Sequence, residues 1–75
     1  MQRVTIYTSR LTDRDKKTAQ EEISKGNMVR IYPTCMNQGR RDIVRYQGEK
    51  FLEELGAKPV NDESVAGEEY LFFKA

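Results

Sequence analysis

The sequence has no histidine, no tryptophan and a single cysteine among its 75 residues. Histidine is the usual general base near neutral pH and the commonest metal ligand, so its absence disfavours both kinds of chemistry. The cysteine and the scattered acidic residues show no zinc-ligand spacing, and no glycine-rich phosphate loop is present. We therefore expect a protein that is not an enzyme and that holds no metal and no cofactor.

Long hydrophobic runs are missing too. No apolar stretch approaches the roughly 20 residues that span a bilayer, and the chain enters its first expected strand without the leader of a secreted protein. One cysteine cannot form an internal disulfide. The expectation is a single domain over residues 1–75, located in the cytoplasm and without membrane contact.

Hydrophobic periodicity predicts strands and helices that alternate along the chain. The expected strands are Val4–Ser9, Val29–Thr34, Lys58–Val60 and Glu69–Phe73, and the expected helices are Thr12–Lys25 and Arg40–Leu55. This βαβαββ order predicts an α+β fold, a two-layer α/β sandwich with both helices on one face of a small mixed sheet. The polar stretch Asn61–Gly67 is expected to join the last two strands as a hairpin.

The two helices differ in their expected share of the core. The first has Thr12 as its N-cap and a narrow apolar stripe, whereas the second carries a broader one. The stripe of the second helix consists of Val44, Phe51 and Leu55, with Ile43 and Leu52 beside it. Gly48 on that stripe costs about 1 kcal/mol relative to alanine, so we interpret it as a close approach to the sheet.

One face of the sheet is expected to remain open. Apolar and polar residues alternate in the first two long strands, which predicts one face packed on the helices and one facing solvent. Tyr7, Arg30 and Tyr32 fall on the open face. Aromatic rings beside guanidinium groups can stack unpaired bases; alternatively, the tyrosines pair across strands and only cover the sheet.

Basic residues concentrate in the first part of the chain. Residues 1–45 carry ten Lys or Arg against five acids, whereas residues 46–75 carry three against seven. The candidate binding residues are Tyr7, Arg30, Tyr32, Arg40, Arg41 and Arg45, with Lys16 and Lys17 on the same basic surface. Ordinary solvated helix faces are the alternative interpretation of this charge.

The single cysteine lies six residues before an arginine, in a C-x5-R spacing formed by Cys35 and Arg41. Cysteine phosphatases use this layout because loop amides and the arginine hold a phosphate while the thiolate attacks it. No acid loop is evident and the chain is short for that scaffold. A partly buried structural thiol is therefore favoured, and Cys35 stays a candidate reactive thiol.

Several short motifs match a known family between Ser9 and Lys74. They are Lys25-Gly26-Asn27, the strand Met28–Tyr32, Arg41-Asp42-Ile43, and the closing Glu69-Tyr70-Leu71-Phe72-Phe73-Lys74. In these and in element order the chain resembles the TusA/SirA-like sulfur-carrier family. That family carries persulfide sulfur on a Cys-Pro-x-Pro motif, where this chain has Ser9-Arg10-Leu11-Thr12. The resemblance thus implies the fold without the sulfur-carrier chemistry.

Taken together, these features predict a small accessory or regulatory binding protein. Its expected partner is another protein or a second copy of the chain, contacted by the open sheet face or the first helix. The alternative is a single-stranded RNA- or DNA-binding domain that uses the six candidate residues. Cysteine chemistry at Cys35 with Arg41 is a third hypothesis.

Overall fold

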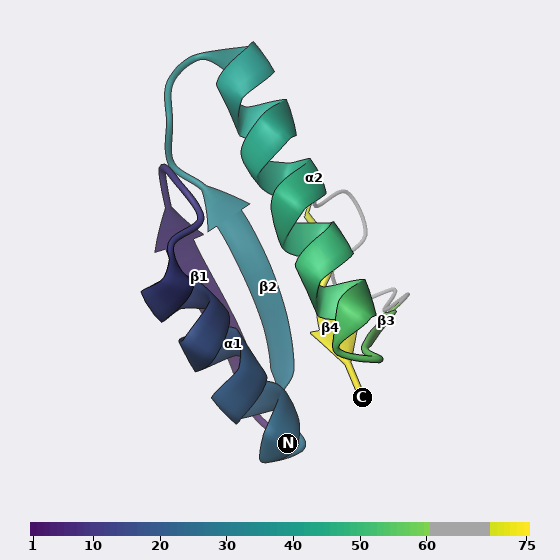
Figure 1. Cartoon of the computed structure of the whole chain (residues 1–75). Helices are drawn as coiled ribbons and strands as arrows, with labels where there is room; N and C mark the ends of the chain where they lie inside the picture. Colours follow the sequence, from purple (N-terminus) through teal and green to yellow (C-terminus); the bar gives the residue numbers. More distant parts are fainter. Residues whose placement is uncertain (61–69) are drawn as a thin grey trace.

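The computed structural model describes residues 1–60 and 70–75. Its elements are β1 (Arg3–Thr8), α1 (Asp13–Ser24), β2 (Met28–Pro33), α2 (Gln38–Glu54), β3 (Lys58–Pro59) and β4 (Phe73–Lys74). The strands form one mixed sheet in the order β1-β2-β4-β3, in which β1 and β2 are parallel. Both helices lie on the same face of this sheet (Figure 1). The predicted α+β sandwich is confirmed.

The helices begin where side chains cap them. The hydroxyl of Thr12 accepts a hydrogen bond from the backbone N–H of Asp15 at 3.1 Å, which confirms the predicted N-cap of α1. Asn37 caps α2 in the same way through the N–H of Arg40, at 3.0 Å. Because Asn37 satisfies a free donor of the first turn, α2 begins at Gln38 rather than at the predicted Arg40.

The C-terminal hairpin has the predicted pairing but a shorter second strand. β3 and β4 are antiparallel, with Pro59 opposite Phe73, and the N–H of Val60 donates to the carbonyl of Phe72 at 2.7 Å. The ladder of β4 covers Phe73–Lys74, whereas the prediction began at Glu69. Glu69 and the expected turn over Asn61–Gly67 lie outside the described residues.

The core lies between the sheet and the two helices. In the register of β1 and β2, Val4 pairs with Val29 and Ile6 with Ile31, so alternate side chains point to the helices. The buried core residues are Ile6, Ala19, Ile23, Val29, Ile31, Val44, Leu52, Ala57 and Phe73. Burying one large aliphatic side chain stabilises the fold by about 1.5–3 kcal/mol. In β1 and β2, the residues that alternate with the buried ones point to the opposite face of the sheet.

Gly48 lets α2 approach β2. A Cβ at this position would lie 3.0 Å from three side-chain atoms of Ile31, which confirms the predicted close approach. Leu52, one turn later, is buried on the same side, but Ile43 is 52% exposed. The prediction of Ile43 beside the core was wrong, because a residue next to Val44 is rotated by about 100° around the helix.

No helix in the described part of the chain combines the length and the apolar content that crossing a membrane requires.

Candidate functional site

The sheet face away from the helices carries aromatic rings and guanidinium groups. We call Tyr7, Arg30, Tyr32 and Phe72 the open-face cluster. Tyr7 and Tyr32 are partners in the register of β1 and β2, and their ring centroids lie 5.5 Å apart at an interplanar angle of 52°. Tyr7 is 65% exposed and Tyr32 is 38% exposed. Two neighbouring rings are therefore accessible from this side.

Arg30 is held in the middle of the cluster. Its guanidinium lies 4.6 Å from the centroid of the Phe72 ring and 5.4 Å from that of Tyr32. The same group donates to the hydroxyl of Thr5 through Nε at 3.3 Å and Nη2 at 3.1 Å. Arg3 lies over Phe72 as well, at 6.0 Å. Each such cation–π contact contributes about 0.5–2 kcal/mol, depending on how far it is desolvated.

The cluster continues toward α2 through Tyr70. The rings of Tyr32 and Tyr70 meet edge to face with centroids 4.8 Å apart, and the guanidinium of Arg45 lies 5.2 Å from the Tyr70 ring. Arg45 also contacts the carboxylate of Glu49 at 3.4 Å. Arg45 thus borders the open-face cluster, while its side chain is already engaged with two neighbours.

The structure brings together only part of the predicted binding set. Tyr7, Arg30 and Tyr32 share the open face, and Arg45 stands at its margin. Arg40, by contrast, lies on the helix side of the molecule, where it lines a hollow between α2 and the loop before α1. Arg41 is turned into the loop before α2, where its Nε donates to the carbonyl oxygen of Cys35 at 2.7 Å.

Cys35 is half-buried and packs against the core. Its carbonyl group, through the hydrogen bond from Arg41, closes the loop between β2 and α2. Cys35 and Arg41 therefore stabilise the loop, through core packing of the thiol side chain and through the side-chain hydrogen bond of Arg41. Within residues 1–60 and 70–75, no group of three or more cysteine or acidic side chains is placed to hold a metal ion.

Sequence reasoning missed Phe72 and Tyr70 as members of this surface. Their alternation with Leu71 and Phe73 was a visible signal of two faces, but it did not say which pair turns to the helices. The pairing of Val29 with Phe73 settles this, because it places Phe73 in the core. Phe72 then falls on the open face, beneath Arg3 and Arg30.

The charged side chains that the described strands supply to the open face are cations. The strands that supply it carry the cations Arg3 and Arg30, and the described residues of β1, β2, β4 and Tyr70–Phe72 include no carboxylate. The face therefore combines rings that can stack with cations that attract anions. An anionic partner with flat rings matches both properties.

Comparison with known proteins found no relative of this chain. No family model, no curated protein and no solved structure matches the chain. The resemblance to the TusA/SirA-like family accordingly stays a prediction, and the functional argument rests on the geometry of the open face.

Proposed function

We propose that this protein is a small non-enzymatic binding module whose open sheet face binds single-stranded nucleic acid. One observation carries the proposal: the adjacent exposed rings of Tyr7 and Tyr32, flanked by the guanidinium of Arg30. Stacking of one base on an aromatic side chain is worth about 1–3 kcal/mol and tolerates any sequence. Contacts between arginine and phosphate make such binding strongly dependent on salt.

The packing of Arg30 supports this role. Thr5 and Phe72 hold the guanidinium beside the ring of Tyr32, so little side-chain entropy remains to be lost when a phosphate or base arrives. Phe72 lies beneath the guanidinium groups and is only 7% exposed, whereas Tyr7 and Tyr32 remain accessible. Tyr32 is thus an accessible ring beside a preordered cation, and Tyr7 is the accessible ring next to it.

A second candidate is self-association through the edge of the sheet. In the described part of the chain, β1 is the longer of the two outer strands and pairs with β2 alone. An unpaired strand edge can accept a strand from another chain, since its backbone donors and acceptors on that side lack partners in the sheet. A second copy is the partner that this edge suits, because Tyr7 would then extend the aromatic face across the dimer.

The test is fluorescence anisotropy with short labelled single-stranded RNA and DNA across a salt series. We expect binding that weakens linearly in the logarithm of salt concentration. Tyr7→Ala and Tyr32→Ala should each lower the affinity about tenfold or more. Tyr46→Ala is the matched control, because Tyr46 is 64% exposed on α2 and outside the open face.

Two outcomes would contradict the proposal. The first is an absence of binding even at low salt; the second is an equal loss in the Tyr46→Ala control. Light scattering on the same samples tests the second candidate, since a mass that doubles with concentration in the absence of oligonucleotide supports pairing at β1.

A further inference from the structure

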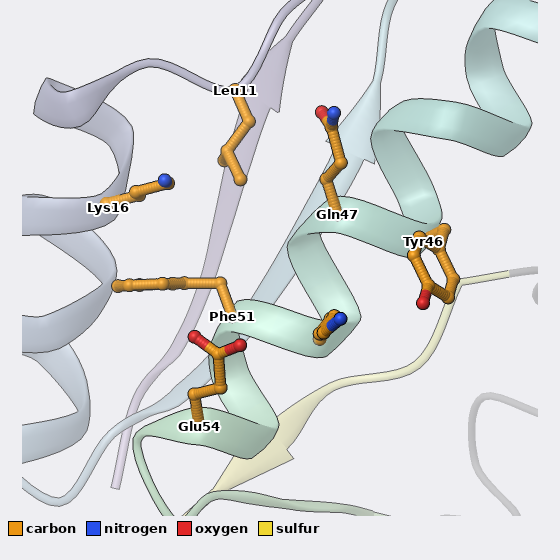
Figure 2. Close-up of a pocket in the computed structure, with 7 residues that line it drawn as sticks. Leu11, Lys16, Tyr46, Gln47, Phe51 and Glu54 are labelled. Carbon is orange, nitrogen blue, oxygen red and sulfur yellow. The ribbon is translucent and has the colours of Figure 1, made fainter.

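An open groove runs along α2 on the helix side of the molecule, facing α1 and the loop before it (Figure 2). It consists of two adjoining hollows of about 350 Å³ and about 330 Å³. Both are lined by Leu11, from the loop after β1, and by Gln47 of α2. The helices cover the sheet face opposite to the open-face cluster, so the groove is a separate surface.

Part of the groove lining is apolar. Phe51 reaches from α2 toward α1, and the ammonium group of Lys16 lies 5.6 Å from its ring centroid (Figure 2). Leu11 contributes aliphatic surface beside it, whereas Val44 borders the groove from the buried core. Ile43, the residue expected in the core, is instead exposed at the groove. The groove therefore offers apolar contacts that the fold leaves uncovered.

The groove is also strongly basic. Its lining residues include four cations, Arg10, Lys16, Arg40 and Lys50, against the single carboxylate of Glu54. No ion pair within residues 1–60 and 70–75 neutralises any of these four cations. Arg10 and Arg40 stand in one hollow and the two lysines in the other, so positive charge follows the groove along its length.

We propose that this groove docks an acidic amphipathic helix of a partner protein. A helix laid between two others presents apolar residues at i, i+3, i+4 and i+7, and these would rest on Leu11, Ile43 and Phe51. Carboxylates flanking that apolar stripe would meet the two arginines at one end and the two lysines at the other, which gives charge complementarity. The protein would then hold two partners on opposite sides.

Other occupants fit the groove less well. A second copy would bring its own four cations against these four, and like charges brought together at an interface are unfavourable. A nucleic acid would be attracted by the same cations, but the aliphatic side chains of Leu11 and Ile43 offer it no ring on which a base could stack. An acidic amphipathic helix matches both the apolar side chains of the groove and the four cations, which make no ion pair within the described residues.

The test is NMR titration of the isotope-labelled protein with a synthetic acidic amphipathic peptide of about four helical turns. The peptide carries leucine at i, i+3, i+4 and i+7 and glutamate at the flanking positions. We expect the amide signals of Leu11, Gln47 and Phe51 to shift and the affinity to fall with salt. A peptide with lysine in place of glutamate should produce no such shifts.

Charge reversal provides the decisive variants. Lys16→Glu with Arg40→Glu should weaken the peptide at least about tenfold, equivalent to 1.4 kcal/mol or more. The matched control is Lys17→Glu with Lys58→Glu, which changes the net charge equally at exposed positions that do not line the groove. Oligonucleotide affinity should depend on Tyr7 and Tyr32 rather than on these groove variants. The two proposals can therefore be tested separately.

Four results would overturn the inference. The first three are no shifts at millimolar peptide, an equal loss in the Lys17→Glu, Lys58→Glu control, and concentration-dependent groove shifts without peptide, which would assign the groove to a second copy. Oligonucleotide binding that disappears with the groove variants but survives Tyr7→Ala would assign the groove to nucleic acid and overturn both proposals.

Discussion

The two faces of the sheet are made by the same strands but behave differently. On β2, Val29 and Ile31 lie buried beneath the helices, while Arg30 and Tyr32, each one residue further on, face away. Aliphatic packing on the covered face contributes the folding free energy. Rings and guanidinium groups on the open face pack on one another and leave Tyr7 and Tyr32 accessible. One face therefore supplies the apolar core, whereas the other carries accessible rings beside cations.

Phe72 and Phe73 show the same division in neighbouring residues. Both are buried, yet Phe73 belongs to the apolar core, whereas Phe72 is covered by Arg3 and Arg30. A core side chain is surrounded by neighbours that cannot leave without unfolding. Phe72 is instead covered by guanidinium groups at the surface, and Arg30 among them is held in place by Thr5.

The largest expected effect is loss of stability on the covered face. Leu52→Ala should lower the free energy of unfolding by about 2–5 kcal/mol, because it leaves a cavity beneath α2. Tyr7→Ala should cost less than about 1 kcal/mol, since its ring is mostly exposed. Urea denaturation followed by circular dichroism measures both values. Equal losses would show that the open face is structural rather than available for binding.

A smaller effect is expected where α2 approaches β2. Gly48→Ala gains about 1 kcal/mol in helix propensity, but the added methyl group meets Ile31 at 3.0 Å, and overpacking costs about 1–3 kcal/mol. We expect a net loss of about 1 kcal/mol, measured by thermal and urea unfolding.

Two variants sharpen that result. Ile31→Val removes one of the three atoms in contact and should recover part of the loss when combined with Gly48→Ala. Gln47→Ala, at an exposed position of the same helix, should change the stability by less than about 0.5 kcal/mol. A net gain from Gly48→Ala would mean that Ile31 moves away and that the covered face is less tightly packed than the structure indicates.

The smallest expected effect concerns pH and lies at the end of α1. The side-chain amide of Asn27 donates to the Glu22 carboxylate at 2.8 Å, and this bond, with the nearby charge of Lys25, lowers the pKa of Glu22 below its usual 4.5. The unfolded chain therefore binds this proton more tightly than the folded one. The contribution is present above the unfolded pKa and is lost as the pH falls through the lowered folded pKa.

Glu22→Gln should remove this part of the acid dependence, measured as the melting temperature across the acid range. Glu21→Gln is the control, because the Glu21 side chain makes no hydrogen bond within the described residues. If both variants keep the wild-type profile, the bond from Asn27 contributes nothing to folding. Glu22 belongs to α1 and not to the open-face cluster, so this pH effect on stability can be measured independently of ligand binding.

Local patterns in the sequence were enough for much of the fold. The order of the elements and the Thr12 cap were predicted correctly. Each depends on residues within a few positions of one another, because caps and the 3.6- and 2-residue periods are properties of short segments. The same alternation placed Tyr7, Arg30 and Tyr32 together.

Packing between distant segments decided the rest. Insertion of β4 between β2 and β3 put Phe72 over the open face, and the rotation of α2 turned Ile43 outward to the groove. The split of the arginines, with Arg30 and Arg45 near the open face and Arg40 in the groove, followed from that arrangement. Strand order and helix rotation minimise exposed apolar area over the whole chain, and no short stretch of sequence contains that information.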